Sequence, residues 1–108
     1  MVTLQEYLDQ KYPTKEDKEK VIYIYASMTN LDLNDKNLEG GELNLQEYIN
    51  LEMLFINSSN EGLKTPLTKL EIGSGKNLRV LCVMDNLLTS LDFLTKLSDP
   101  KKMEVIEV

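Results

Sequence analysis

Two stretches of the chain decide its fold. They are Leu78-Arg-Val-Leu-Cys-Val-Met-Asp-Asn-Leu-Leu88 and its upstream echo Leu51-Glu-Met-Leu-Phe-Ile56. In the longer stretch, apolar residues stand at positions 78, 81, 83 and 88, and an asparagine stands at position 86. This spacing fits neither the period of a helix nor the simple alternation of a strand. It predicts a short strand followed by a sharp turn, which returns the last leucine to the same interior.

Related strand cores recur about every 25 residues, which is a spacing typical of stacked repeats. The four cores are Leu31-Asp-Leu33, Leu54-Phe-Ile56, Leu81-Cys-Val83 and Ile106-Glu-Val108, and each follows an apolar residue at Met28, Leu51, Leu78 or Met103. A second, weaker series lies between them at Leu43-Asn-Leu45, Leu70-Glu-Ile72 and Leu91-Asp-Phe93. One such unit cannot bury its own apolar side, so we expect a solenoid of parallel strands. Its equivalent positions would be Leu31, Leu54, Leu81 and Ile106.

The segment Leu78–Leu88 resembles the leucine-rich-repeat motif Leu-x-x-Leu-x-Leu-x-x-Asn-x-Leu at every fixed place. The two upstream copies depart from it, because Lys36 and Ser59 occupy the asparagine position. The resemblance covers about three and a half repeats and implies an α/β-repeat solenoid with a parallel sheet on its concave side. It also implies a role in protein recognition. The helical start followed by the segment up to Gly41 looks like short fungal proteins of this family.

Residues 1–27 differ from the repeats at 28–108, and we interpret them as an N-terminal cap. Thr3-Leu-Gln-Glu6 has the form of a capping box and predicts a helix from about Thr3 to Lys11, which Pro13 prevents from continuing. Val21-Ile-Tyr-Ile-Tyr25 is β-branched and aromatic, which favours a strand after a short helix. The same residues also allow a helical face, so a helix is the alternative.

Strand alternation predicts which side chains face solvent on the concave side. One row would contain Asp32, Phe55, Cys82 and Glu107, the next Asn30, Met53, Val80 and Val105, and the third Asn34, Asn57 and Met84. The first repeat is polar in these rows, whereas the middle two carry an apolar set at Met53, Phe55, Val80, Cys82 and Met84. Exposed apolar patches of this kind usually contact something. A protein or peptide partner, a second copy of the chain, and cover by the chain's own loops or cap are the three interpretations.

The last predicted strand has no amphipathic segment after it. An uncovered strand offers unpaired backbone groups and apolar side chains to another chain. We therefore expect self-association, with formation of a homodimer, through Met103, Val105, Ile106 and Val108. The alternative is that this sequence is the leading part of a longer repeat array.

Composition argues against several classes of function. The 108 residues carry a net charge of −6, which disfavours binding to nucleic acid, and they include no histidine, the commonest general base and metal ligand. No apolar run is long enough for a membrane span, and the N-terminus lacks the pattern of a signal peptide. The single cysteine suits a reducing compartment. We expect a cytoplasmic protein without cofactor, metal or membrane association.

Three local motifs have plain structural interpretations. Gly73-Ser-Gly75-Lys76 lacks the spacing of a phosphate-binding loop and lies where the repeat needs a turn. Asp32, Asp35 and Glu42 do not follow a calcium-binding loop pattern. Cys82 has no histidine to activate it as a nucleophile. The sequence therefore predicts a non-enzymatic interaction module, with a self-associating structural unit as the alternative.

Overall fold

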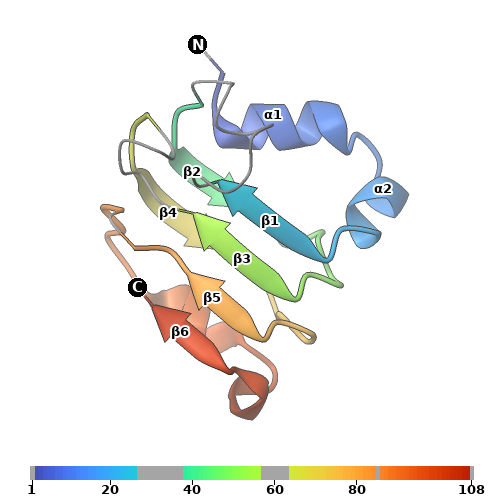
Figure 1. The fold of residues 1–108 in the computed structure, drawn as a ribbon, viewed down its shortest axis with the longest axis vertical. Coiled ribbons are helices and arrows are strands. Elements are labelled where there is room, and N and C mark those ends of the chain that lie inside the picture. The colour runs from blue at the N-terminus through green and yellow to red at the C-terminus, as the bar shows by residue number, and fades with distance from the viewer. Residues whose placement is uncertain (1, 27–37, 57–63, 85, 108) are drawn as a thin grey trace.

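The computed structural model describes residues 2–26, 38–56, 64–84 and 86–107 (Figure 1). Its largest element is a parallel four-stranded sheet in the order β1-β3-β5-β6. These strands are β1 (Tyr23–Ala26), β3 (Met53–Ile56), β5 (Val80–Cys82) and β6 (Val105–Glu107). A second parallel sheet pairs β2 (Gly41–Asn44) with β4 (Leu67–Glu71), and Figure 1 shows it behind the first. From β1 to β5, the chain therefore alternates between the two sheets.

The register of the four-stranded sheet confirms part of the predicted alignment. Leu54 lies opposite Leu81, and Leu81 lies opposite Ile106. The other neighbour of Leu54 is Ile24, so the sheet position that we predicted for Leu31 belongs to Ile24. Leu31 itself lies outside the described residues, as does the rest of the predicted strand at 31–33.

The position of Ile24 has a physical explanation. Strands favour β-branched and aromatic residues, and aspartate and asparagine are depleted from them. Val21-Ile-Tyr-Ile-Tyr25 meets this preference, whereas the predicted strand core at 31–33 has an aspartate at its centre and the sequence Asn-Asp directly after it. The strand interpretation of residues 21–25 is confirmed for the part that forms β1.

Helices occupy the start of the chain and the connection between β5 and β6. Helix α1 (Leu4–Lys11) begins at Thr3, whose Oγ1 accepts from the Glu6 backbone N–H at 3.1 Å, while Glu6 Oε1 accepts from the Thr3 N–H at 3.2 Å. This confirms the predicted capping box and helix. Helix α2 (Lys15–Glu19) follows, and two 3-10 helices, η1 (Asp92–Lys96) and η2 (Pro100–Lys102), precede β6. Within the described ranges, none of the helices combines the length and apolar character needed to cross a bilayer.

The core lies between the two sheets and continues under α1. Its side chains come from α1, from strands of both sheets and from η1, and they form one cluster. Those with no measurable exposure are Leu4, Leu45, Leu54, Ile56, Leu67 and Leu81. Leu43 and Leu70 of the second sheet, together with Phe93 of η1, are buried in the same cluster, in agreement with the weaker apolar series. Leu91, which belongs to that series, is 45% exposed.

Asn86 joins the end of one sheet to the start of the other. Its Nδ2 donates to the carbonyl oxygens of Ile56 and Val83, both at 2.9 Å, and to that of Met84 at 3.0 Å. Its Oδ1 accepts from the backbone N–H of Leu67 at 2.8 Å. A side chain that offers both donors and an acceptor is needed here, which is the chemistry that asparagine supplies.

The glycine-rich segment at 73–76 is a turn, as predicted. Gly73 and Gly75 have φ angles of 77° and 52°, a backbone region that favours glycine. A Cβ atom at Gly75 would also lie 2.8 Å from Leu97 Cδ2. These glycines therefore serve the path of the chain from β4 to β5.

Candidate interaction surface

The outer face of the four-stranded sheet is the candidate site. We define it by the side chains that point away from the core along β1, β3, β5 and β6. They form two rows in the sheet register, one of Tyr25, Phe55, Cys82 and Glu107 and one of Tyr23, Met53, Val80 and Val105. Alternation places these side chains opposite to the buried Ile24, Leu54 and Leu81.

The first position of each row differs from the prediction. We expected the polar residues Asn30 and Asp32 beside Met53 and Phe55, but Tyr23 and Tyr25 lie there. Asn30 and Asp32 lie outside the described residues, as do Asn34 and Asn57 of the third predicted row. The prediction of a polar first strand was therefore wrong, because β1 comes from the segment that we interpreted as the cap.

The two tyrosines extend the apolar face into an aromatic row. The ring of Tyr25 lies 4.9 Å from that of Phe55 at an interplanar angle of 64°, and Tyr23 lies 5.3 Å from Tyr25. The Tyr25–Phe55 pair is edge-to-face, which is a favourable geometry for aromatic rings, whereas the Tyr23 and Tyr25 rings are tilted by 34°. Tyr25 Oη also lies 4.0 Å from the sulfur of Met53. These contacts hold the ring edges in place across β1 and β3.

The residues of the outer face differ in their exposure. Tyr23 is 53% exposed and Val105 is 40% exposed, while Met53, Phe55 and Val80 are half-buried. Met84 follows β5 in a turn and is 41% exposed. Cys82, which we expected on the solvent side, is only 7% exposed, so it adds little accessible surface. The available patch is therefore centred on β1 and β3 and extends to Met84 and Val105.

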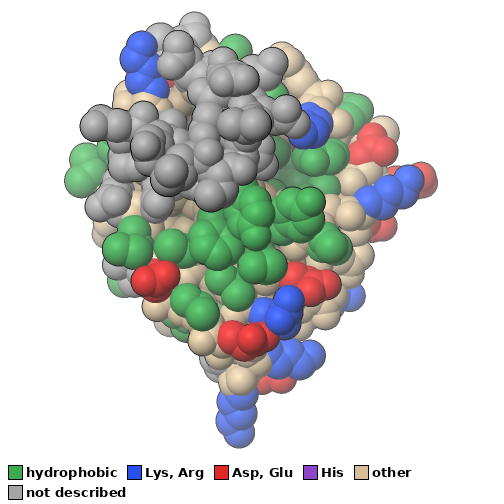
Figure 2. All heavy atoms as spheres, viewed as in Figure 1, with side chains coloured by type: hydrophobic (Ala, Val, Ile, Leu, Met, Phe, Trp, Pro, Cys, Tyr) green, Lys and Arg blue, Asp and Glu red, His purple; other side chains and the backbone are tan. Residues whose placement is uncertain are grey.

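Charged residues border this patch where the strands begin. Arg79 Nη1 lies 2.7 Å from Glu104 Oε2, and Arg79 Nη2 lies 3.4 Å from Glu52 Oε1. The hydrogen bond to Glu104 is the main cause of a raised pKa for the Arg79 guanidinium. Figure 2 shows hydrophobic side chains gathered over the middle of the sheet and charged side chains below them. An apolar centre with a charged rim is typical of protein interfaces.

The residues predicted for self-association lie around β6, whose described partner is β5 alone. Ile106 is 46% exposed, although its register partner Leu81 is fully buried. Val105 is exposed as well, whereas Met103 packs partly against the core. Val108 lies outside the described residues. The described part of the structure therefore leaves both faces of β6 accessible.

Few other groups in the described residues have unusual surroundings. Within the described ranges, no group of three or more Cys, Asp or Glu side chains could hold a metal ion. Tyr48 is 3% exposed, and its hydroxyl has no hydrogen-bond partner in that part of the structure. Burial, followed by the nearby charge of Asp9, raises the pKa of Tyr48 above its ordinary value. This arrangement bears on the stability of the fold.

Sequence reasoning missed Tyr23 and Tyr25 as residues of the face. A signal was present, because Tyr23 and Tyr25 alternate with Ile22 and Ile24 as a half-buried strand requires. The repeat spacing pointed to Leu31 instead. Comparison with known proteins adds no assignment: no protein-family model, no curated protein and no solved structure matches the chain.

Proposed function

We propose that this chain is a short leucine-rich-repeat solenoid that binds a protein or peptide through the outer face of its four-stranded sheet. Support for the solenoid comes from the motif at Leu78–Leu88 and from the parallel register of Leu54, Leu81 and Ile106. The alternation of the chain between two parallel sheets agrees with it. In such a solenoid, the four-stranded sheet is the concave side.

One observation supports the binding role above all. The side of the sheet that points away from the core is apolar and aromatic at Tyr23, Tyr25, Met53, Phe55 and Val80. A solvent-facing strand surface normally carries polar side chains, and the core of the protein does not need these residues. Aromatic residues and methionine are also enriched at the centres of protein interfaces.

The face indicates the chemistry of its partner. Its centre would take an apolar or aromatic side chain, for which the aromatic row and the sulfur of Met53 offer an adaptable surface. Glu52, Arg79 and Glu104 at the border would exclude water and select polar groups on the partner. The proposed ligand is therefore a protein surface or peptide with an apolar anchor.

A capture experiment with two matched variants tests this function. Phe55→Glu introduces a charge at the centre of the face, whereas Leu87→Glu introduces the same charge at a residue that is 68% exposed beside β4. A partner captured by the wild type should be lost with Phe55→Glu and kept with Leu87→Glu. Affinity for the identified partner should fall by at least about tenfold with Phe55→Glu. Equal binding by both variants would remove the outer face from the proposal.

Self-association through β6 is the second candidate, and the exposure of Ile106 favours it. The edge of β6 that no described strand covers could pair with the same edge of another copy, which would cover Ile106 and Val105. Sedimentation equilibrium of the wild type and of Ile106→Lys tests this. A dimer that dissociates in the variant is expected, and a strict monomer at high concentration of the wild type would contradict it.

A further inference from the structure

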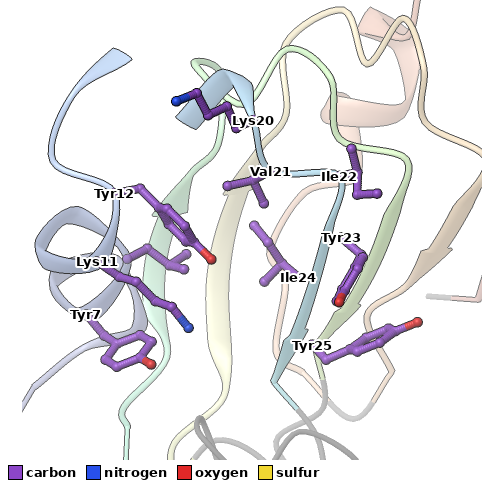
Figure 3. Close-up of a pocket in the computed structure, with 10 residues that line it drawn as sticks. Tyr7, Lys11, Tyr12, Lys20, Val21, Ile22, Tyr23, Ile24 and Tyr25 are labelled. Atoms are coloured by element: carbon purple, nitrogen blue, oxygen red, sulfur yellow. The ribbon is translucent and has the colours of Figure 1, made fainter. Parts of the chain in front are cut away.

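Two spaces beside the sheets differ in whether their polar groups are already engaged. The first, between α1 and β1, has a volume of about 350 Å³. Figure 3 shows Lys11 between Tyr7 and Tyr12 in its wall, and Lys11 Nζ lies 5.8 Å from both ring centres, so this lysine is already engaged. The second space, of about 200 Å³, lies between β4 and η1. The polar groups that decide its chemistry belong to the backbone of β4.

Leu70 of β4 turns its backbone N–H and C=O away from β2. The Leu45 N–H donates to the carbonyl oxygen of Glu71 at 2.8 Å, so Glu71 faces β2. Neighbouring residues of a parallel strand bond to opposite sides. Leu70, which precedes Glu71, therefore faces the other edge of β4. That edge borders the second space, and Leu70 is one of its lining residues.

The chain after β5 runs along this edge but leaves it at Leu70. The carbonyl oxygen of Thr68 accepts from the Thr89 N–H at 3.3 Å, and that of Ser74 accepts from the Ser98 N–H at 2.7 Å. Between these two hydrogen bonds, the segment 89–98 is longer than the segment 68–74, and η1 takes up the excess. No described residue bonds to the Leu70 backbone from this side. The hydrogen-bond ladder therefore has a gap at Leu70, closed at both ends.

The gap selects a small group that both donates and accepts. Its ligand must offer an acceptor to the Leu70 N–H and a donor to the Leu70 carbonyl. A primary carboxamide carries both, whereas a carboxylate only accepts and an ammonium group only donates. A continuous peptide strand does not fit, because the hydrogen bonds of Thr89 and Ser98 close the two ends. The volume is also below the roughly 300 Å³ at which pockets for drug-sized ligands begin.

The protein itself pairs carboxamides with backbone groups of this second sheet. Gln5 Oε1 accepts from the Asn44 N–H at 2.6 Å at the outer edge of β2. Asn86 Oδ1 accepts from the Leu67 N–H at 2.8 Å on β4, while its Nδ2 donates to carbonyl oxygens. Leu70 presents the same kind of backbone group without such a side chain. A carboxamide from outside would extend this pattern.

The charged side chains around the gap favour a neutral ligand. In the described part of the chain, they are Lys69, Glu71, Asp92 and Lys96, so acidic and basic groups are equal in number. Lys69 Nζ lies 3.5 Å from Glu71 Oε1, and these two charges therefore compensate each other. Walls of this kind give neither an anion nor a cation an electrostatic advantage.

We propose that the gap beside β4 binds a primary carboxamide, whose oxygen accepts from the Leu70 N–H and whose NH₂ group donates to the Leu70 carbonyl. A free small amide and the side chain of a glutamine in a partner share this chemistry. The site lies on the second sheet, away from the outer face of the four-stranded sheet. It therefore does not depend on the partner proposed for that face.

An NMR titration of the full 108-residue chain with acetamide tests the proposal. The Leu70 amide signal should shift in a saturable way, with a Kd on the order of millimolar for so small a ligand. N,N-dimethylacetamide has no donor and acetate has neither donor nor neutral charge, so both should bind more weakly. If the Leu70 signal does not respond to acetamide, water alone occupies the gap and the proposal fails. Equal binding of N,N-dimethylacetamide would also overturn it.

Two peptides distinguish the sources of the amide. They are Gly-Gln-Gly and Gly-Glu-Gly, each with an N-acetyl and a C-terminal N-methylamide block. Tighter binding of the glutamine peptide than of acetamide would identify a partner's side chain as the ligand, and weaker binding would identify a free small amide. Equal shifts of the Leu70 signal by the glutamate peptide would contradict the requirement for a carboxamide.

Matched protein variants locate the ligand. Ser90 is exposed and lines the space, so the bulky side chain of Ser90→Trp should fill the space and weaken acetamide binding by at least about tenfold. Lys101→Trp introduces the same side chain on η2, outside the space, and should leave binding unchanged. The spectrum of each variant also reports whether it is folded. Undiminished binding by folded Ser90→Trp would place the amide elsewhere and refute the site at Leu70.

Discussion

The outer side of the two-stranded sheet carries Glu42, Asn44, Lys69 and Glu71, whereas the outer face of the four-stranded sheet carries tyrosines, methionine, phenylalanine and valine. On β2 and β4, Glu42 lies opposite Lys69, and the Lys69 Nζ is 3.5 Å from Glu71 Oε1. Both sheets turn leucines inward to the same core. Both sheets therefore alternate inward and outward side chains, but the outward ones are polar on the two-stranded sheet and mostly apolar on the four-stranded sheet.

This difference shows what the fold requires and what it leaves open. Burial of the inward leucines satisfies the core of both sheets, and the polar side of β2 and β4 shows that an outward apolar residue is unnecessary for it. The apolar residues on the four-stranded sheet need another explanation. The partner recognition proposed above is one such explanation, and substitutions on the two sheets test it.

The largest effect on stability is expected in the core, to which both sheets contribute buried leucines. Leu54→Ala should lower the free energy of unfolding by about 2–5 kcal/mol, because Leu54 is fully buried and the truncation leaves a cavity. Phe55→Ala, one residue away on the opposite side, should cost about 1 kcal/mol through its lost contact with Tyr25. Urea denaturation measures both. Equal costs would mean that the outer face belongs to the core.

The connection between the two sheets gives the next effect. Asn86→Ala should cost about 2–3 kcal/mol, since three carbonyls and the Leu67 N–H lose their partner. Asn44→Ala is the control, because Asn44 is exposed. Thermal melts should show a much smaller shift for the control. Similar shifts of the melting temperature in both variants would show that the hydrogen bonds of Asn86 add little to stability.

Substitution of Tyr48, which lies in the connection from β2 to β3, should raise the stability of the protein. Tyr48→Phe removes a buried hydroxyl without a partner among the described residues and should raise stability by about 1 kcal/mol. The folded state raises the pKa of Tyr48 above 10.0, so it holds the phenol proton more tightly than the unfolded chain does. Wild-type stability should therefore be intact below pH 10.0 and fall above it. This additional fall should be absent in Tyr48→Phe, and parallel pH profiles would contradict the assignment.

The smallest effect is expected on the apolar face itself. Val80→Thr keeps a β-branched side chain in β5 and should cost no more than about 0.5 kcal/mol. The same change should reduce binding of a hydrophobic dye such as ANS, because it makes the face more polar. Thr68→Val, at an exposed residue of β4, is the reverse exchange on the other sheet and should increase dye binding. Dye fluorescence that stays the same in both variants would contradict the difference between the two faces.

Much of the main sheet could be predicted because leucine spacing reports burial directly. The alignment of Leu54 with Leu81 and Ile106 follows from that spacing, and the parallel register agrees with it. The first strand could not be assigned in this way. Leu31 continued the spacing, whereas Ile24 lies in a segment whose only signal was β-propensity, which depends strongly on context.

The candidate sites were predictable to different degrees. Met53, Phe55 and Val80 follow from alternation along strands that were correctly located, whereas the burial of Cys82 depends on neighbours that spacing does not reveal. The position of α1 beside β2 was beyond prediction from the spacing of apolar residues. That position is set by contacts between segments far apart in sequence, such as Gln5 with Asn44.

The place of β1 has a practical consequence for anyone who shortens this protein. A fragment that starts after residue 27 would discard both tyrosines and strip the edge of β3, whose backbone groups would then be open to other molecules. Such a fragment should aggregate in solution rather than remain a folded monomer. The segment that the sequence indicates as an N-terminal cap therefore contains the first strand of the four-stranded sheet.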